Sequence, residues 1–156
     1  MLRTIPSTAY EAMNSSDPYN LNRFLDAQNG IYERVTSELR AGQKSSHWMW
    51  FIFPQIRGLG HTETSIFFAI SSFQEAEAYL EHPMLGPRLR ECCELLMQIE
   101  GRSISQIFGS PDDLKLRSSM TLFAQTSGQN ALFKDVLQRY FDGRVDPRTL
   151  ELLGAK

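Results

Sequence analysis

The chain has 156 residues, of which 42% are hydrophobic and 22% are charged, proportions that are ordinary for a soluble globular protein. A chain of this length fits one domain that can bury roughly 70% of the surface it exposes when unfolded. Proteins bind the nucleic-acid backbone through clustered Lys and Arg side chains, and the formal net charge of −2 argues against such binding. We therefore expect no nucleic-acid partner.

The N-terminal region shows neither a secretory signal nor a membrane span. Residues 1–17 are rich in Ser, Thr and Asn with little periodic pattern, which predicts a flexible arm ahead of a single all-helical domain at 18–156. The longest apolar run, Trp48 to Phe53, is far too short to cross a bilayer, so no membrane contact is expected. The only two cysteines, Cys92 and Cys93, are adjacent, and neighbouring cysteines rarely form a disulfide with each other. The lack of a disulfide framework favours a location in the reducing cytoplasm.

Apolar residues one helical turn apart predict helices in the first half of the chain. Residues 18–41 carry such a stripe, which Gly30 interrupts and Gly42 ends. Ser45 or Ser46 is expected to cap a short helix through the Trp/Phe run, and Pro54 ends that helix because the residue before proline resists helical angles. A loop follows at 56–60, and an amphipathic piece begins at residue 62.

The second half has clearer helix boundaries. Ser72 with Glu75 three residues later predicts a capping box for a helix that ends at His82, and the next helix covers about 84–99. A short turn at 104–108 precedes the stretch from Ser110 to Asp113, where a capping serine, a proline and two carboxylates predict a helix reaching about residue 126.

Two further helices are expected at about 130–141 and from Asp146-Pro147 onward. No strand-like alternation persists beyond four residues, except around 67–71. The predicted fold is therefore all-α, a single compact bundle of about seven or eight short to medium helices.

Standard chemical motifs are absent from the sequence. There is no P-loop, no G-x-G-x-x-G after a strand, no H-E-x-x-H and no G-x-S-x-G. The three histidines, His47, His61 and His82, are scattered, and no cysteine or histidine pair has metal-ligand spacing. We therefore expect neither a metal site nor a cofactor.

The most informative stretch is residues 45–60, SSHWMWFIFPQIRGLG, which contains both tryptophans. Trp48 and Trp50 would project about 200° apart on a helix, so one is expected in the core while the other is a candidate to line a cavity. His47, in the first turn of that helix, is a candidate to contact a ligand or to bond a backbone carbonyl. Gln55 and Arg57 follow on a loop carried by a rigid aromatic scaffold, where polar groups either contact a ligand or are simply exposed to solvent.

Two other polar groupings are candidates for a site. Asp113 and Arg117 form an i, i+4 pair beside Ser118, either as an exposed ion pair or, if they face a cavity near His47, as an anion-binding or proton-transfer element. Gln28 and Tyr32 lie one turn apart on an otherwise apolar helix. A buried glutamine needs hydrogen-bond partners, so Gln28 either braces the tryptophan run or touches a ligand.

Several stretches resemble a known family. They are PYNLNRFLDAQ at 18–28, ELRAGQKSSHWMWFIFPQIRGLG at 38–60, EAEAYLEHPMLGPRL at 75–89, IFGSPDDLKLRSSMTLF at 107–123, and residues 136–153. These resemble the small bacterial proteins of domain-of-unknown-function family 1810, which are sometimes labelled calpastatin. The resemblance implies a single all-helical domain and no established activity. The calpastatin label finds no support, since a protease-inhibitor repeat of that kind would be disordered.

Residues 82–113 are also similar in layout to the riboflavin-biosynthesis-associated glycosidase superfamily, which handles ADP-ribose or NAD-derived compounds. That resemblance implies that Asp113 matches its aspartate. The chain departs from the pattern where the superfamily carries a Glu-His pair, because Ala27 and Gln28 stand there. An N-glycosidase needs a carboxylate to stabilise oxocarbenium charge or activate water, and Glu38 and Asp113 are the nearest substitutes.

Three hypotheses follow. The first is a module that binds a nucleotide-like small molecule by stacking on Trp48 or Trp50, with polar contacts from His47, Gln55, Arg57, Arg117 and Ser118 and with Gln28 and Tyr32 nearby. The second is an N-glycosidase-type hydrolase of an NAD- or ADP-ribose-related metabolite, with Asp113 and His47 as catalytic candidates. The third is a protein–protein adaptor using the exposed part of the aromatic segment.

The first two hypotheses depend on one packing arrangement. The tryptophan run must fold against the helix that begins near Pro111 and leave a small recess with polar side chains. If His47, Asp113 and Arg117 converge on one concavity, the two pocket hypotheses survive. If their side chains point into separate regions, both pocket hypotheses fail and the adaptor becomes the leading one.

Overall fold

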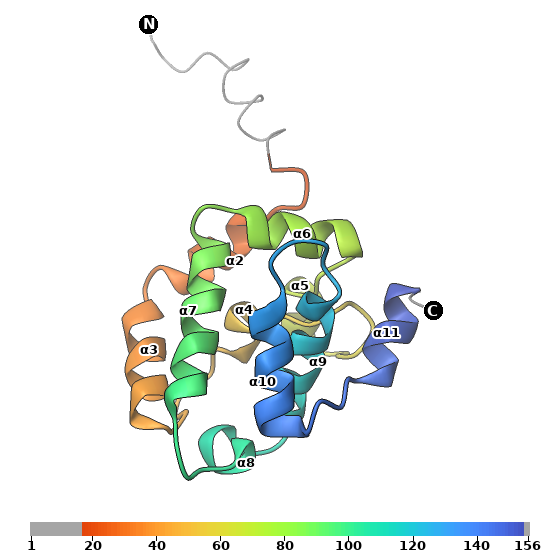
Figure 1. The fold of residues 1–156 in the computed structure, drawn as a ribbon. Helices are drawn as coiled ribbons and strands as arrows, with labels where there is room; N and C mark the ends of the chain where they lie inside the picture. Colours follow the sequence, from red (N-terminus) through yellow and green to blue (C-terminus); the bar gives the residue numbers. More distant parts are fainter. Residues whose placement is uncertain (1–16, 155–156) are drawn as a thin grey trace, which may run out of the picture.

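Helices form nearly all the regular structure in residues 17–154, the part of the chain that the computed structural model describes (Figure 1). Ten helices lie in this range, and the predicted all-α fold is confirmed. Seven have seven or more residues and three have four or five. They are α2 (Asn22–Gln28), α3 (Tyr32–Ala41), α4 (Met49–Ile52), α5 (Glu63–Phe67), α6 (Phe73–Glu81), α7 (Leu85–Gln98), α8 (Ile104–Phe108), α9 (Asp112–Ala124), α10 (Ala131–Phe141) and α11 (Pro147–Leu153).

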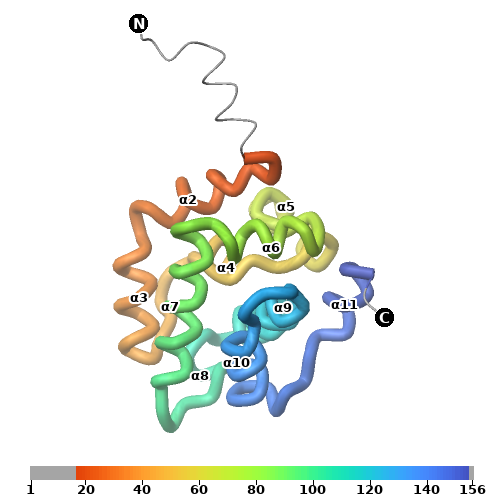
Figure 2. Tube along the Cα trace, turned by 45° about the horizontal axis from the view of Figure 1, so that its top comes forward, coloured from red at the N-terminus to blue at the C-terminus, as the bar shows by residue number. Residues whose placement is uncertain are grey.

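The longest helix, α7, lies at the centre of the bundle, and α3, α6 and α10 all pack against it. Figure 2 shows α3 alongside α7 and α9 next to α10. Helix α9 also contacts α4, α6, α8 and α11, so it is surrounded on several sides. This position brings α9 against the short helix that carries the tryptophan run.

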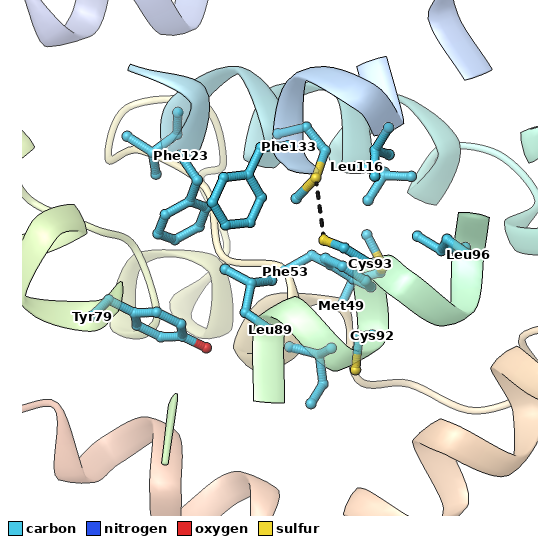
Figure 3. Packing of buried hydrophobic residues seen from close by; sticks show 14 of the residues in the cluster. Met49, Phe53, Tyr79, Leu89, Cys92, Cys93, Leu96, Leu116, Phe123 and Phe133 are labelled. Atoms are coloured by element: carbon cyan, nitrogen blue, oxygen red, sulfur yellow. Dashed lines mark hydrogen bonds between the residues drawn. The ribbon is translucent and has the colours of Figure 1, made fainter. Parts of the chain in front are cut away.

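The core lies between α7, α9 and α10 and includes the two cysteines (Figure 3). Cys92 and Cys93 are free thiols with no exposed surface, and the Cys93 Sγ lies 3.6 Å from the Met120 Sδ of α9. Both thiols are therefore part of the hydrophobic core. Burial raises the pKa of the Cys92 thiol to about 12, so this sulfur is an inert packing group rather than a nucleophile.

Most predicted helix boundaries are confirmed. The chain leaves the helical path between Gln28 and Tyr32, around Gly30, and Gly42 caps α3 in the left-handed conformation that glycine adopts at no steric cost. The hydroxyl of Ser72 accepts the N–H of Glu75, as predicted for a cap. The Glu75 carboxylate does not complete the predicted capping box, because it accepts hydrogen bonds from Ser71 and Arg23.

Two predicted caps are wrong. Ser46 does not cap the tryptophan helix, because its hydroxyl and backbone N–H both donate to the buried Glu38 carboxylate, and α4 begins only at Met49. Ser110 does not cap α9 either. Pro111 occupies the N-cap position, where no side chain accepts a hydrogen bond. The first backbone N–H groups of α9 donate to the carbonyls of Gly109 and Pro111.

A buried ion pair fastens the N-terminal side of the bundle. The Arg23 guanidinium lies 2.7 Å from the Glu75 carboxylate and also donates to the carbonyls of Tyr19, Asn20, Phe67 and Ala69. Its donors thus connect α2 with segments more than forty residues later. An arginine suits this role because its planar guanidinium offers five donors in a fixed geometry.

The loop after Pro54 is held from two sides. Gln55 and Arg57 exchange backbone hydrogen bonds with Ile70, both 2.8 Å, forming an isolated parallel bridge close to the 67–71 stretch with strand-like character. On the other side, the Leu152 side chain of α11 lies against Gly58, where an added Cβ would come within 2.9 Å of it. This loop therefore has a fixed position.

The predicted flexible arm at 1–17 lies outside the described residues except for Asp17. The Asp17 carboxylate accepts the backbone N–H of Leu21 at 2.7 Å. From residue 17 to 154, none of the helices combines the length and apolar character that a bilayer crossing requires.

Candidate functional site

The tryptophan segment, defined here as residues 48–55, lies against the first turn of α9. The Nζ of Lys44, just before the segment, is 2.8 Å from the Asp112 carboxylate on α9. The Nζ of Lys115, one turn later on α9, lies 5.5 Å from the ring centroid of Trp50. The expected packing of the tryptophan segment against this helix is therefore present.

The Asp112 carboxylate pairs with two lysines, and each of these lysines lies near one tryptophan ring. We call Lys44, Trp48, Trp50, Asp112 and Lys115 the Asp112 cluster. Oδ2 of Asp112 pairs with Lys44 at 2.8 Å, and Oδ1 lies 3.9 Å from Lys115. The Lys44 Nζ is 5.0 Å from the Trp48 ring centroid, matching the contact between Lys115 and Trp50. Both contacts are within the range of cation–π attraction.

The two lysines differ in what they can still bind. The Lys44 side chain is only 6% exposed, and its ammonium donates to the Ser46 carbonyl as well as to Asp112. The Lys115 side chain is 28% exposed, and its ammonium lies at the outer limit of ion pairing with Asp112. An ammonium group has three donor hydrogens. Lys115 is therefore the member of the cluster with donors available for an anion.

Glu38 of α3 holds the start of the tryptophan segment. Its carboxylate accepts the backbone N–H groups of Ser45 and Ser46, the Ser46 hydroxyl and the Trp48 indole N–H at 2.6–3.2 Å. Burial alone raises the pKa of Glu38, but these hydrogen bonds stabilise the anion more and lower the pKa to about 2. The carboxylate is thus an ionised positioning group with its lone pairs occupied.

The two tryptophans have separate roles, as their helical offset predicted. Trp48 is 1% exposed and packs edge-on against Phe108 in the core, so it lines no pocket. Trp50 is only partly buried and borders a recess with Gln55. Core packing is therefore the role of Trp48, and Trp50 is the indole that a ligand could reach.

The recess beside Trp50 is small. It has a volume of about 10 Å³, close to the minimum that holds one water molecule. Its lining residues are Trp50, Gln55, Ile56, Gly60, Ser65, Phe68 and Ala69. The Gln55 side chain is partly exposed, and the structure gives its amide no hydrogen-bond partner among residues 17–154. A ligand could therefore bond this amide, but a nucleotide-sized pocket is not open here.

His47, Asp113 and Arg117 do not converge on one concavity. Asp113 accepts the Ser105 hydroxyl at 2.6 Å and the N–H of Leu114, while Arg117 donates to the carbonyls of Arg144 and Val145. His47 is exposed and precedes α4 rather than lying in its first turn. These three side chains lie in separate regions, so the pocket hypothesised from them is absent. A proposal for binding at Trp50 must therefore rest on other residues.

Helical geometry explains the error on α9. Successive residues of an α-helix are about 100° apart, so Asp112 and Lys115 share one face, whereas Arg117 projects about 160° away from Lys115. The Ser118 hydroxyl bonds the Asp146 carboxylate at 2.7 Å, near α11. The sequence thus indicated the correct helix but the wrong face of it.

The remaining candidates have partners within the protein or face solvent. Gln28 is buried and donates to the Phe51 carbonyl at 2.7 Å, so it braces the tryptophan segment, and its oxygen accepts from Arg88. The Tyr32 hydroxyl donates to Glu91, and the Arg88 guanidinium lies over its ring. Arg57 is exposed on the loop after Gln55.

Sequence reasoning missed Lys44, Asp112 and Lys115 as site residues. One signal was available, because Lys44 lies four residues before Trp48 and Asp112 lies three before Lys115. Nothing in that spacing says that the two segments meet. Among residues 17–154, no three His, Cys, Asp or Glu side chains are grouped as a metal ion would need.

Comparisons with known proteins agree with this fold. The sequence profile of a family described as a protein of unknown function, DUF1810, matches residues 18–153. The chain belongs to the DUF1810 family. A crystal structure of the conserved hypothetical protein Rv1873 from Mycobacterium tuberculosis is similar to it, with 54% identity and a TM-score of 0.88. The similarity covers 90% of this chain and 100% of that one. No match was found among curated proteins.

Proposed function

We propose that this DUF1810 protein binds a small, nucleotide-like anion on the ring of Trp50. One observation carries the proposal: the partly buried Trp50 indole has the Lys115 ammonium 5.5 Å from its ring centroid and borders a recess that Gln55 also lines. An aromatic face stacks on a nucleobase without needing a particular base. The lysine supplies the charge that a phosphate requires, and the amide supplies a donor and an acceptor.

The small recess sets the expected affinity. Enclosed ligand sites usually have volumes of about 300–1,000 Å³ and bury most of the ligand. A ligand lying over Trp50 would stay largely in water, with about 1–3 kcal/mol from stacking and a modest charge contribution. A dissociation constant near 1 mM corresponds to about 4 kcal/mol. We therefore expect millimolar binding unless Trp50 moves.

Tryptophan fluorescence tests the proposal directly, because the two indoles differ in exposure. Titration with AMP is expected to quench the wild type partly, through Trp50 alone. The quenched fraction should rise in Trp48→Phe, which retains only the Trp50 indole, and quenching should vanish in Trp50→Phe. Quenching that survives in Trp50→Phe, or none in the wild type at 10-fold the expected constant, about 10 mM, refutes the proposal.

Charge is tested separately. Lys115→Met keeps the length of the side chain but removes the ammonium, and we expect AMP binding to weaken about fivefold or more. Lys134→Met is the matched control, because Lys134 is an exposed lysine on α10. Equal loss in both variants would mean that only the net charge matters, and the role given to Lys115 would fail.

The hydrolase hypothesis has less support. Asp113 does not line the recess and bonds Ser105, and the Glu38 carboxylate is occupied by four hydrogen bonds. Asp112 pairs with Lys44 at 2.8 Å. A free carboxylate, which glycosidic cleavage needs, is therefore not among the residues beside Trp50.

One observation favours the adaptor as a second candidate. Ile66 and Phe67 of α5 are 52% and 54% exposed, and the Phe67 ring packs on Phe68, which lines the recess. Exposed apolar neighbours of this kind often contact a protein partner. A photo-crosslinking residue at position 67 would then capture a partner that the same residue at position 134 does not. Identical adducts at both positions, or none, would count against an adaptor.

For location, we propose the reducing cytoplasm, on the basis of two free thiols buried in the core.

A further inference from the structure

A second cavity lies where the loop that joins α9 to α10 meets α6. The loop lies against that helix (Figure 1), and a cavity of about 190 Å³ opens between the loop, α6 and α7. Charged side chains of both signs line it: Arg90 from α7, and Glu77 and Glu81 from α6. It shares no lining residue with the recess beside Trp50, so it is a separate place on the molecule.

The Arg90 guanidinium is held in place without a polar partner. Its Cζ lies 5.2 Å from the ring centroid of Phe133, a fully buried side chain of α10. An arginine has five N–H donors, and no acceptor within residues 17–154 takes a hydrogen bond from those of Arg90. Arg23 differs, because its guanidinium bonds carbonyls and a carboxylate. Arg90 is only half-buried, so its donors are available to an anion from solution.

Two carboxylates line the same cavity without pairing with Arg90. Glu77 accepts the backbone N–H of Ser127 at 3.0 Å and the Ser127 hydroxyl, both at Oε2. These hydrogen bonds lower the pKa of Glu77, so the carboxylate is ionised at neutral pH. Glu81 is exposed, and in the described part of the chain neither carboxylate has a cation within ion-pairing distance. Opposite charges therefore line one cavity with a gap between them.

The loop side of the cavity is already fixed. The Asn130 side-chain amide donates to the carbonyls of Ala124 and Thr126 at 2.9 and 2.7 Å. The bonds from Ser127 to Glu77 tie the same loop to α6. A site whose walls are ordered in advance loses less entropy when a ligand binds.

The gap and the volume together define what fits. A molecule that bridges the gap needs an anionic group for the guanidinium and a cationic group for the carboxylates. Sites for drug-sized ligands have volumes of about 300–1,000 Å³. A cavity of about 190 Å³ is smaller and holds the equivalent of about six water molecules. A free amino acid has this size and carries both charges on one carbon atom.

We infer that this cavity binds a small zwitterionic α-amino acid with an aliphatic side chain. The ligand carboxylate pairs with the Arg90 guanidinium, whose planar fork suits a carboxylate. The ligand ammonium lies between that group and the carboxylates of Glu77 and Glu81. The aliphatic side chain rests on Leu80, which also lines the cavity. The ligand thereby supplies a partner of opposite sign to each charge.

L-valine and two analogues test the need for both charges. Isovalerate lacks the ammonium of valine, and isobutylamine lacks its carboxylate. Valine should shift the backbone amide NMR signals of Gly128 and Gln129 with a dissociation constant of about 1–10 mM, and each analogue should bind at least tenfold more weakly. Equal binding of isovalerate would reveal a simple anion site, and equal binding of isobutylamine a simple cation site. Either result, or no shift at about 100 mM valine, overturns the inference. The Trp50→Phe variant should bind valine like the wild type, and a loss there would place valine at the other recess and overturn it too.

Two substitutions test the charged side chains. Arg90→Met keeps the length of the side chain and its contact with Phe133, and valine binding should weaken at least tenfold. Glu81→Gln changes an exposed residue at the end of α6 and should weaken binding about three- to tenfold. Arg34→Met and Glu94→Gln are the matched controls, because both residues are exposed on other helix faces, and they should leave valine affinity unchanged. Wild-type affinity in Glu81→Gln, or an equal loss in its control, overturns the inference even if Arg90→Met fails to fold.

Discussion

Replacing Glu38 by glutamine should destabilise the protein in a way that depends on pH. The ordinary pKa of the carboxyl is 4.5, and its hydrogen bonds in the folded protein lower the pKa to about 2. A difference of this size corresponds to about 3 kcal/mol of folding free energy from the ionised form. This contribution is complete above pH 5 and is lost as the pH falls towards 2, because protonation removes the anion that the surrounding donors stabilise.

Urea unfolding at several pH values measures this contribution. At pH 7 the Glu38→Gln variant should be about 3 kcal/mol less stable than the wild type, with a melting temperature lower by roughly 6–12 °C. At pH 3 the deficit should shrink to about 1 kcal/mol, because the Glu38 carboxyl of the unfolded chain, with its ordinary pKa of 4.5, is by then almost fully protonated. Glu33→Gln on the exposed side of the same helix is the control and should change stability by less than about 0.5 kcal/mol. A deficit below 1 kcal/mol at pH 7, or one of equal size at pH 3, would refute the role given to the Glu38 carboxylate.

Three further predictions concern the core. Arg23→Met leaves the buried Glu75 carboxylate without its ion-pair partner and should cost about 3–5 kcal/mol in urea unfolding, and a loss below 1 kcal/mol would contradict the pairing seen here. Cys92 and Cys93, both without exposed surface, should react with a thiol reagent only as fast as the protein unfolds, so rapid reaction under native conditions would argue against their burial. Gly86→Ala would place a Cβ 2.0 Å from a backbone carbonyl of the preceding helix, so we expect a loss of about 3 kcal/mol or more, and a variant of wild-type stability would mean that α6 and α7 lie further apart.

The fold was largely predictable because local chemistry marks its boundaries. Gly42, Ser72 and Asp146 each act as a helix cap at the position where the sequence indicates one. The failures at Ser46 and Ser110 have different causes. At Ser110, the first N–H groups of α9 bond the carbonyls of Gly109 and Pro111 instead of a serine hydroxyl. Ser46 bonds Glu38, eight residues earlier, and that contact depends on how α3 and the following loop pack.

The site was harder to predict because α9 has no single apolar stripe. Leu116 and all residues from Ser118 to Ala124 are buried, so contacts surround the helix. Periodicity therefore cannot say which of its polar faces meets the tryptophan segment. The burial of Lys44 could not be predicted either. A lysine is normally exposed unless it is paired, and the partner of Lys44, Asp112, lies nearly seventy residues later in the chain.

The contact between Leu152 and Gly58 bears on how the chain folds as it leaves the ribosome. About ninety residues separate these two positions, and protein synthesis adds roughly 5–20 residues per second. For several seconds a nascent chain therefore carries the loop next to Trp50 without the helix that covers it. During that interval its apolar side chains are open to aggregation or to a chaperone, and the region proposed to hold the ligand is among the last to settle.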